Sequence, residues 1–146
     1  MKYTEGTIGR VFALTFEHGD LFIERLVEFV REKNVRNAYI FMLGAMETGR
    51  IVTGPKDLTL PAAPVWSEFS DGRELLGAGS VMWAEGAPKP HIHIAAGRGG
   101  ETLLGCLREG GKVHIVVEAV LFEVDFGGLE KVHDAGIGAF LPDHKK

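Results

Sequence analysis

Hydrophobic and polar residues alternate with two different periods in the first third of the chain. β-branched and aromatic residues dominate from Ile8 to Phe16, which predicts a first strand. From Leu21 to Lys33 apolar residues recur every three or four positions, while most charged residues fall on the other side. This spacing predicts an amphipathic helix covering a sheet. Asp20 is a candidate N-cap, because its carboxylate can accept hydrogen bonds from the free amides of the first turn.

The next segment, from Ala38 to Met46, is a nearly continuous run of apolar side chains. Such a run is typical of a strand buried on both faces, although its periodicity also fits a buried helix. The rest of the chain consists of short apolar-rich segments separated by Gly, Pro or Asp, which favours a predominantly antiparallel sheet with one major helix. These segments are 48–53, 63–69, 74–83, 91–96 and 112–124.

Length and composition narrow the class of protein. A chain of 146 residues with 45% hydrophobic residues is long enough for one domain with its own core, and no repeat or linker divides residues 1–146. No apolar run approaches the roughly 18 residues of a membrane-spanning helix. The N-terminus lacks the basic and then apolar segments of a signal peptide. We therefore expect a cytoplasmic protein with no membrane partner. The formal charge of −4 disfavours a broad basic face for nucleic acid.

The strongest chemical motif is the histidine pair in Pro90-His91-Ile92-His93-Ile94. Side chains two positions apart in a strand project from the same face, so His91 and His93 share one side. Two imidazoles held side by side supply two ligands of a metal site, with zinc as the candidate cofactor. The alternative is a polar, solvent-facing side of a strand with no metal.

Two residues downstream are candidates for a third ligand. Cys106 offers a thiolate, which zinc accepts beside nitrogen ligands, although a lone cysteine between leucines is more often a small buried residue. His114 alternates onto the same face as Glu118, and the two are expected to line a common pocket. Glu118 is then a candidate hydrogen-bond partner that orients a ligating histidine, or part of a structural hydrogen-bond network. If the site is catalytic, Glu118 is a candidate general base.

Other motifs give weaker signals. No serine stands in a Gly-x-Ser-x-Gly pattern, which disfavours a serine hydrolase. Residues 97–100 form a glycine-rich segment that lacks the features of a phosphate-binding loop, so we expect a hairpin turn. Within that turn Arg98 is a candidate for binding an anionic ligand.

Several of these segments together resemble the PPC domain, the plants-and-prokaryotes-conserved domain that plant nuclear proteins carry beside AT-hooks. The resemblance is strongest over residues 9–124 and rests on the order and spacing of short motifs. These are Gly9-Arg10, Gly19-Asp20, Leu43-Gly44-Ala45, Glu74-Leu75-Leu76-Gly77, Pro90 to Ile94, Gly100 to Leu107, and Val117-Glu118-Ala119-Val120.

The resemblance implies an α/β (α+β) domain with a mainly antiparallel sheet of about seven strands, assembled as a homotrimer. It also implies that His91 and His93 match the paired histidines of the family. Cys106 stands where prokaryotic members often place a further histidine, so the cysteine either preserves metal binding or abolishes it. The DNA association of plant members comes from basic AT-hooks, and this chain has none.

Three functions follow as hypotheses. The first is a stand-alone homotrimeric domain for assembly and ligand binding, with a zinc site at His91 and His93 completed by Cys106 or His114. The second is a zinc-dependent hydrolase with Glu118 as general base, acting on an unknown small molecule. The third is a DNA-binding regulatory protein whose trimer gathers arginines on one surface, namely Arg10, Arg36, Arg50, Arg73 and Arg98.

Overall fold

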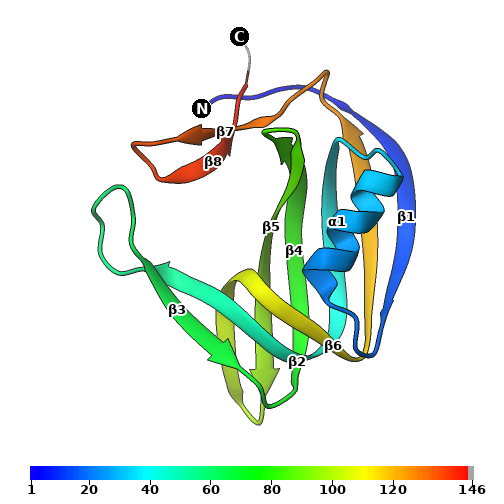
Figure 1. Ribbon diagram of the computed structural model, residues 1–146, viewed down its shortest axis with the longest axis vertical. Helices are drawn as coiled ribbons and strands as arrows, with labels where there is room; N and C mark the ends of the chain where they lie inside the picture. The colour runs from blue at the N-terminus through cyan, green and yellow to red at the C-terminus, as the bar shows by residue number, and fades with distance from the viewer. Residues whose placement is uncertain (145–146) are drawn as a thin grey trace.

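The computed structural model describes residues 1–144, and six of its strands form one antiparallel sheet (Figure 1). The order in the sheet is β1-β6-β5-β4-β2-β3, one helix, α1, accompanies it, and β7 and β8 form a separate hairpin. This architecture confirms the predicted fold class. The bounds are β1 Thr7–Glu17, α1 Phe22–Glu32, β2 Asn37–Pro55, β3 Pro64–Phe69, β4 Arg73–Ala84, β5 Ala87–Arg98, β6 Glu101–Asp125, β7 Lys131–Asp134 and β8 Ala139–Pro142.

Two long strands close the sheet on itself. The first part of β6 pairs with β5, whereas its later part pairs with β2, which also pairs with β4. Register shifts between β2 and β6, one of them at Gly44, bend the strands, as bulges do. Gly44 has φ +138°, and a Cβ there would meet the carbonyl oxygen of Val116, so this bend requires glycine.

Two predicted boundaries are wrong because of these bulges. The segments 38–46 and 48–53 are one strand, β2, and β6 begins at Glu101 rather than at Lys112. The glycines and the charged residues between the apolar segments predict breaks, but the hydrogen-bonded ladder continues through the bulged positions.

The helix packs its predicted apolar side against the sheet. Phe22, Leu26 and Val30 have no exposed surface and join the core beneath α1. The ring of Phe22 also lies 4.6 Å from that of Phe16 on β1, centroid to centroid. Burial of this stripe fixes the helix on one face of the sheet and leaves the opposite face free for other side chains.

Asp20 is not the N-cap of this helix. The cap position is Leu21, which makes no side-chain capping bond. The Asp20 carboxylate turns back instead, and its Oδ2 accepts a hydrogen bond from the Glu17 amide at 3.0 Å. Arg25 Nε lies 3.5 Å from the other carboxylate oxygen. The carboxylate therefore stabilises the turn between β1 and α1 rather than the first helical turn.

Leu26→Ala should destabilise the fold by about 2–5 kcal/mol, because it removes a fully buried side chain and leaves a cavity beneath α1. Urea denaturation followed by circular dichroism measures this change. Arg31→Ala, on the exposed side of the same helix, is the matched control and should stay within about 0.5 kcal/mol. Equal effects of the two substitutions would contradict the assignment of the buried face.

Within residues 1–144, α1 is too short and too polar to cross a membrane, and the chain has no other helix there.

Candidate metal centre

Strand β5 directs its two histidines away from the core. Ile92 and Ile94 are at most 1% exposed and point inward, so His91 and His93 project outward, as the alternation of a strand requires. The register then sets His93 directly opposite Cys106 of β6. A cysteine thirteen positions away in the sequence therefore joins the histidine pair only because β5 and β6 are neighbouring strands.

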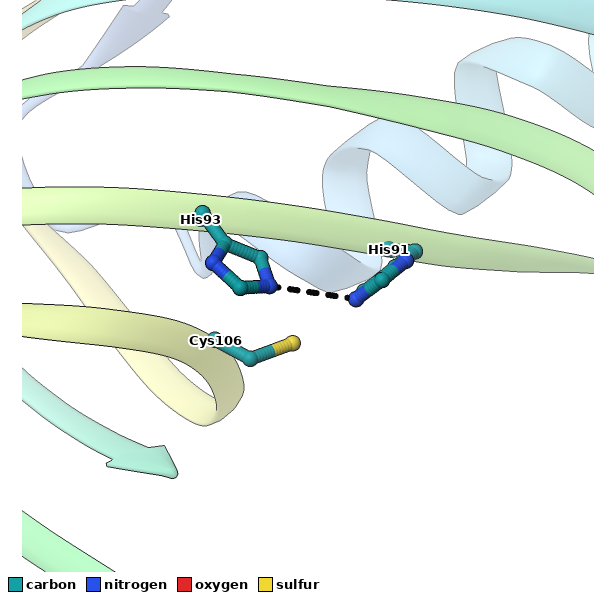
Figure 2. Close-up of side chains that lie close together, drawn as sticks. All are labelled: His91, His93 and Cys106. Atoms are coloured by element: carbon teal, nitrogen blue, oxygen red, sulfur yellow. Dashed lines mark hydrogen bonds between the residues drawn. The ribbon is translucent and has the colours of Figure 1, made fainter. Parts of the chain in front are cut away.

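The three side chains converge on one point (Figure 2). His93 Nε2 lies 3.2 Å from His91 Nε2, and the ligand atoms of His91, His93 and Cys106 all lie within 4.8 Å of one another. Two nitrogens of a tetrahedral zinc site stand roughly 3.3 Å apart when each bond is about 2.0–2.1 Å. The two nitrogens are joined by a hydrogen bond in this structure (Figure 2), and their separation also fits zinc. The two-nitrogen, one-sulfur donor set is one that zinc accepts.

The surroundings favour the metal-binding form of His91. Desolvation lowers the pKa of His91, and the positive charges of Lys131, His93 and Arg108 lower it further. A lower pKa keeps the imidazole neutral at neutral pH, and the neutral imidazole is the form that donates to a metal.

Cys106 is held mainly as a thiol when no metal is bound. The residue is 4% exposed, and desolvation raises the pKa of its thiol, although Arg108 and Lys131 act in the opposite direction. A bound cation would displace the thiol proton, because the thiolate is the ligand. The lone cysteine is therefore buried, with its sulfur within 4.8 Å of the two histidine nitrogens.

Lys131 is a residue near this group that the sequence analysis did not identify. It begins β7, is only 6% exposed, and its Nζ donates to the Lys89 carbonyl at 3.4 Å. Desolvation lowers the pKa of Lys131. Only the β7–β8 hairpin, which the sequence analysis did not predict, places this amine beside β5. No motif around residue 131 signals that position.

His114, the other candidate third ligand, lies elsewhere. It pairs with Ala45 of β2, and its ring is 5.5 Å from that of His18, so it does not join His91 and His93. Glu118 lines a cavity on the outer face of the sheet, and His114 is not among the residues that line it. The expected common pocket of His114 and Glu118 is therefore not formed.

Glu118 is separated from the histidine pair by two strands. It stands opposite Leu43 of β2, and β4 lies between β2 and the histidine-bearing β5. No hydrogen bond or ion pair within residues 1–144 joins Glu118 to His91, His93 or Cys106. Glu118 and His93 share only the wide cavity that both line.

Arg98 ends β5 at the glycine-rich turn, which is the hairpin expected there. Its guanidinium donates to the Asp71 carbonyl, and Nη1 also lies 3.7 Å from the Asp71 carboxylate. Part of its hydrogen-bonding capacity and its charge are thus engaged by Asp71, which weakens its case as a ligand-binding residue.

An exposed apolar face adjoins His91, His93 and Cys106, the candidate metal ligands that are called the metal group below. Leu43, Leu76 and Leu104 fall in one row across β2, β4, β5 and β6, and their exposed fractions are 51%, 68% and 64%. Phe41 lies in the next row, which ends in His93 and Cys106. These side chains line a hollow of about 830 Å³. A large apolar patch of this kind on a single chain marks a surface for association or ligand binding.

Comparison with known proteins identifies the class. Residues 3–125 match the model of the Plants and Prokaryotes Conserved (PCC) domain, and the chain belongs to this family. The sequence matches none of the curated proteins.

Solved structures share the fold along most of the chain. A metal-containing protein from Archaeoglobus fulgidus is 26% identical, with 97% of this chain and 99% of that chain covered and a TM-score of 0.85. A plant- and prokaryote-conserved protein from Pyrococcus horikoshii is 22% identical, with 100% and 99% covered and a TM-score of 0.85. A protein from Ralstonia eutropha JMP134, named as a candidate DNA-binding protein, is 21% identical, with 90% and 89% covered and a TM-score of 0.76.

Proposed function

We propose that this protein is a cytoplasmic, homotrimeric PCC-domain protein that binds zinc and serves in assembly and ligand binding. The observation that supports it most directly is the convergence of His91, His93 and Cys106 on one point at the edge of an apolar face. The metal-containing relative from Archaeoglobus fulgidus adds support, since it shares the fold over nearly its whole length. Zinc bound to three protein ligands keeps a fourth position for an external ligand, which it would polarise.

Metal analysis of protein purified without added metal tests the zinc site. We expect about one zinc ion per chain, because the three donors belong to one chain. A chelator should remove the ion and lower the melting temperature, since metal binding stabilises only the folded state. Absence of zinc together with unchanged melting in chelator would overturn this part of the proposal.

The apolar row of β2, β4 and β6 supports self-association. Its leucines are more than half exposed on a single chain, and covering them in a trimer would remove that surface from water. The family resemblance supplies the trimeric stoichiometry. Light scattering at micromolar concentration tests it, and a monomeric mass would contradict it.

DNA binding is less well supported than assembly. The five arginines expected to form a basic surface each lie next to a carboxylate, for example Arg10 beside Glu123 at 2.6 Å and Arg50 beside Glu109 at 2.7 Å. Arg36 pairs with Glu130, while Arg73 and Arg98 share the single carboxylate of Asp71. Paired arginines contribute little net positive potential, whereas phosphate backbones are bound through net positive charge. The candidate DNA-binding relative from Ralstonia eutropha supports only the fold, because a protein that is 21% identical need not share the function.

The zinc-hydrolase alternative lacks a nearby base within one chain. Glu118 makes no hydrogen bond or ion pair with the metal group in residues 1–144, and two strands separate it from His93 in the sheet, although both line the same wide cavity. We therefore place ligand binding ahead of hydrolysis. A hydrolytic activity of the zinc-loaded protein that is lost in both His93→Ala and Glu118→Gln would place hydrolysis ahead of ligand binding.

A further inference from the structure

Two cations lie beside the His–His–Cys group without an Asp or Glu partner in residues 1–144. Lys131 Nζ donates to the carbonyl of Lys89, two residues before His91 on β5, and Arg108 follows Cys106 by two residues on β6, so both cations act electrostatically on His91 and Cys106. Within residues 1–144 neither forms a salt bridge, although most other arginines and several lysines of the chain do. The group itself holds no Asp or Glu. This part of the surface therefore concentrates positive charge on a protein whose formal charge is −4.

Lys131 is the more informative of the two. Its residue is 6% exposed, and its Nζ has one hydrogen-bond partner in the described chain, the Lys89 carbonyl at 3.4 Å. An ammonium group can donate three hydrogen bonds, and burying it without a counter-charge costs free energy. An apolar side chain of the same length would fill the position without that cost. The one anionic group of the described chain that acts on this amine is the Cys106 thiolate, which would also be a metal ligand, so the buried amine favours a further anionic partner.

Bound zinc would add further positive charge next to Lys131 and Arg108. A divalent ion with one thiolate ligand leaves one positive charge, to which Lys131 and Arg108 add one each. The donor set supplies three ligands, so the fourth position of a tetrahedral ion faces outside the protein's own side chains. Oxygen anions suit both zinc and an ammonium group, because each of their oxygens accepts a separate contact.

We infer that the metal centre binds a small oxyanion, a carboxylate or phosphate group, with one oxygen on the metal and another accepting a hydrogen bond from Lys131. This inference rests on the proposed zinc site and adds the chemical class of its ligand. Arg108, two residues beyond Cys106 and exposed, would attract the anion from solvent. The arrangement assigns Lys131 to positioning of the bound anion rather than to metal ligation.

Isothermal titration of zinc-loaded protein with inorganic phosphate, and separately with acetate, tests the inference. We expect saturable binding of at least one of the two, at one anion per zinc, in a chloride buffer. Tighter binding of phosphate would assign a phosphate-bearing ligand, and tighter binding of acetate a carboxylate. Lys131→Met should weaken the preferred anion at least about tenfold, since it removes a charged hydrogen bond. Lys131→Arg, which keeps the charge, should retain most of the affinity.

Lys33→Met is the matched control, because Lys33 is exposed and paired with Glu32, away from the metal group. It should leave anion affinity unchanged, and zinc content should equal that of the parent protein in all three variants. Normal zinc content with no anion binding, or with equal binding by Lys131→Met, would overturn this inference alone. Failure of the parent protein to bind zinc would overturn the proposed function and this inference together.

Discussion

A His93→Ala variant is expected to lose zinc affinity by more than about 100-fold. His93 is the central member of the metal group, since it lies 3.2 Å from His91 through their Nε2 atoms and stands opposite Cys106 in the strand register. Loss of groups that merely orient a metal ligand costs about 10–100-fold in affinity, so loss of a direct ligand should cost more. Competition with a chromophoric zinc chelator measures the affinity, and circular dichroism verifies the fold.

His114→Ala is the matched control for this experiment. Both histidines are solvent-facing residues of the same sheet, but His114 lies beside His18 and outside the metal group. Its removal should leave zinc affinity unchanged. If His114→Ala weakened zinc as strongly as His93→Ala, the third ligand would be His114 and the assignment of Cys106 would be wrong.

Leu76→Glu is expected to convert the proposed trimer into monomers. Leu76 is 68% exposed on the single chain and stands in the middle of the apolar row, between Leu43 on β2 and Ala95 on β5. In a closed interface the new carboxylate would lie in apolar surroundings. Burial of an unpaired charge there costs several kcal/mol, which opposes association of the copies. Three copies related by symmetry would each contribute this cost. Light scattering should report about a third of the parent mass.

The control for this substitution is Leu58→Glu. Leu58 is 96% exposed, lies in the segment between β2 and β3, and does not line the hollow on the outer face. It should leave the mass unchanged, which separates a general effect of charge from an effect of the apolar row. A Leu76→Glu protein that remains trimeric would show that the copies meet through another surface.

The elements of this fold were largely predictable because their signals are local. The spacing of Phe22, Leu26, Phe29 and Val30 by three and four predicted α1, and Phe22, Leu26 and Val30 are fully buried. The lengths of β2 and β6 were not predictable, because glycines within them have the same residue pattern as a turn. Whether a glycine ends a strand or forms a bulge depends on the partner strand, and that partner is distant in sequence.

The metal group was predictable in part. Two histidines two positions apart share a strand face whatever the rest of the chain does, so the pair followed from the strand prediction. The choice between Cys106 and His114 did not follow, since both belong to β6 and are an even number of positions apart, which predicts the same strand face for both. The cross-strand register places Cys106 against His93 and His114 against Ala45.

By itself, the sequence of this protein determined the helix α1, most of its strands and the same-face pair His91 and His93, because each depends on residues close together in the chain. It also determined the acidic charge, which is a sum over the residues. Only the tertiary structure decided that Cys106 joins the pair, that Lys131 lies beside it, and that Leu43, Leu76 and Leu104 form one exposed row. Strand register and the position of the β7–β8 hairpin set those contacts, and both depend on the packing of segments far apart in sequence.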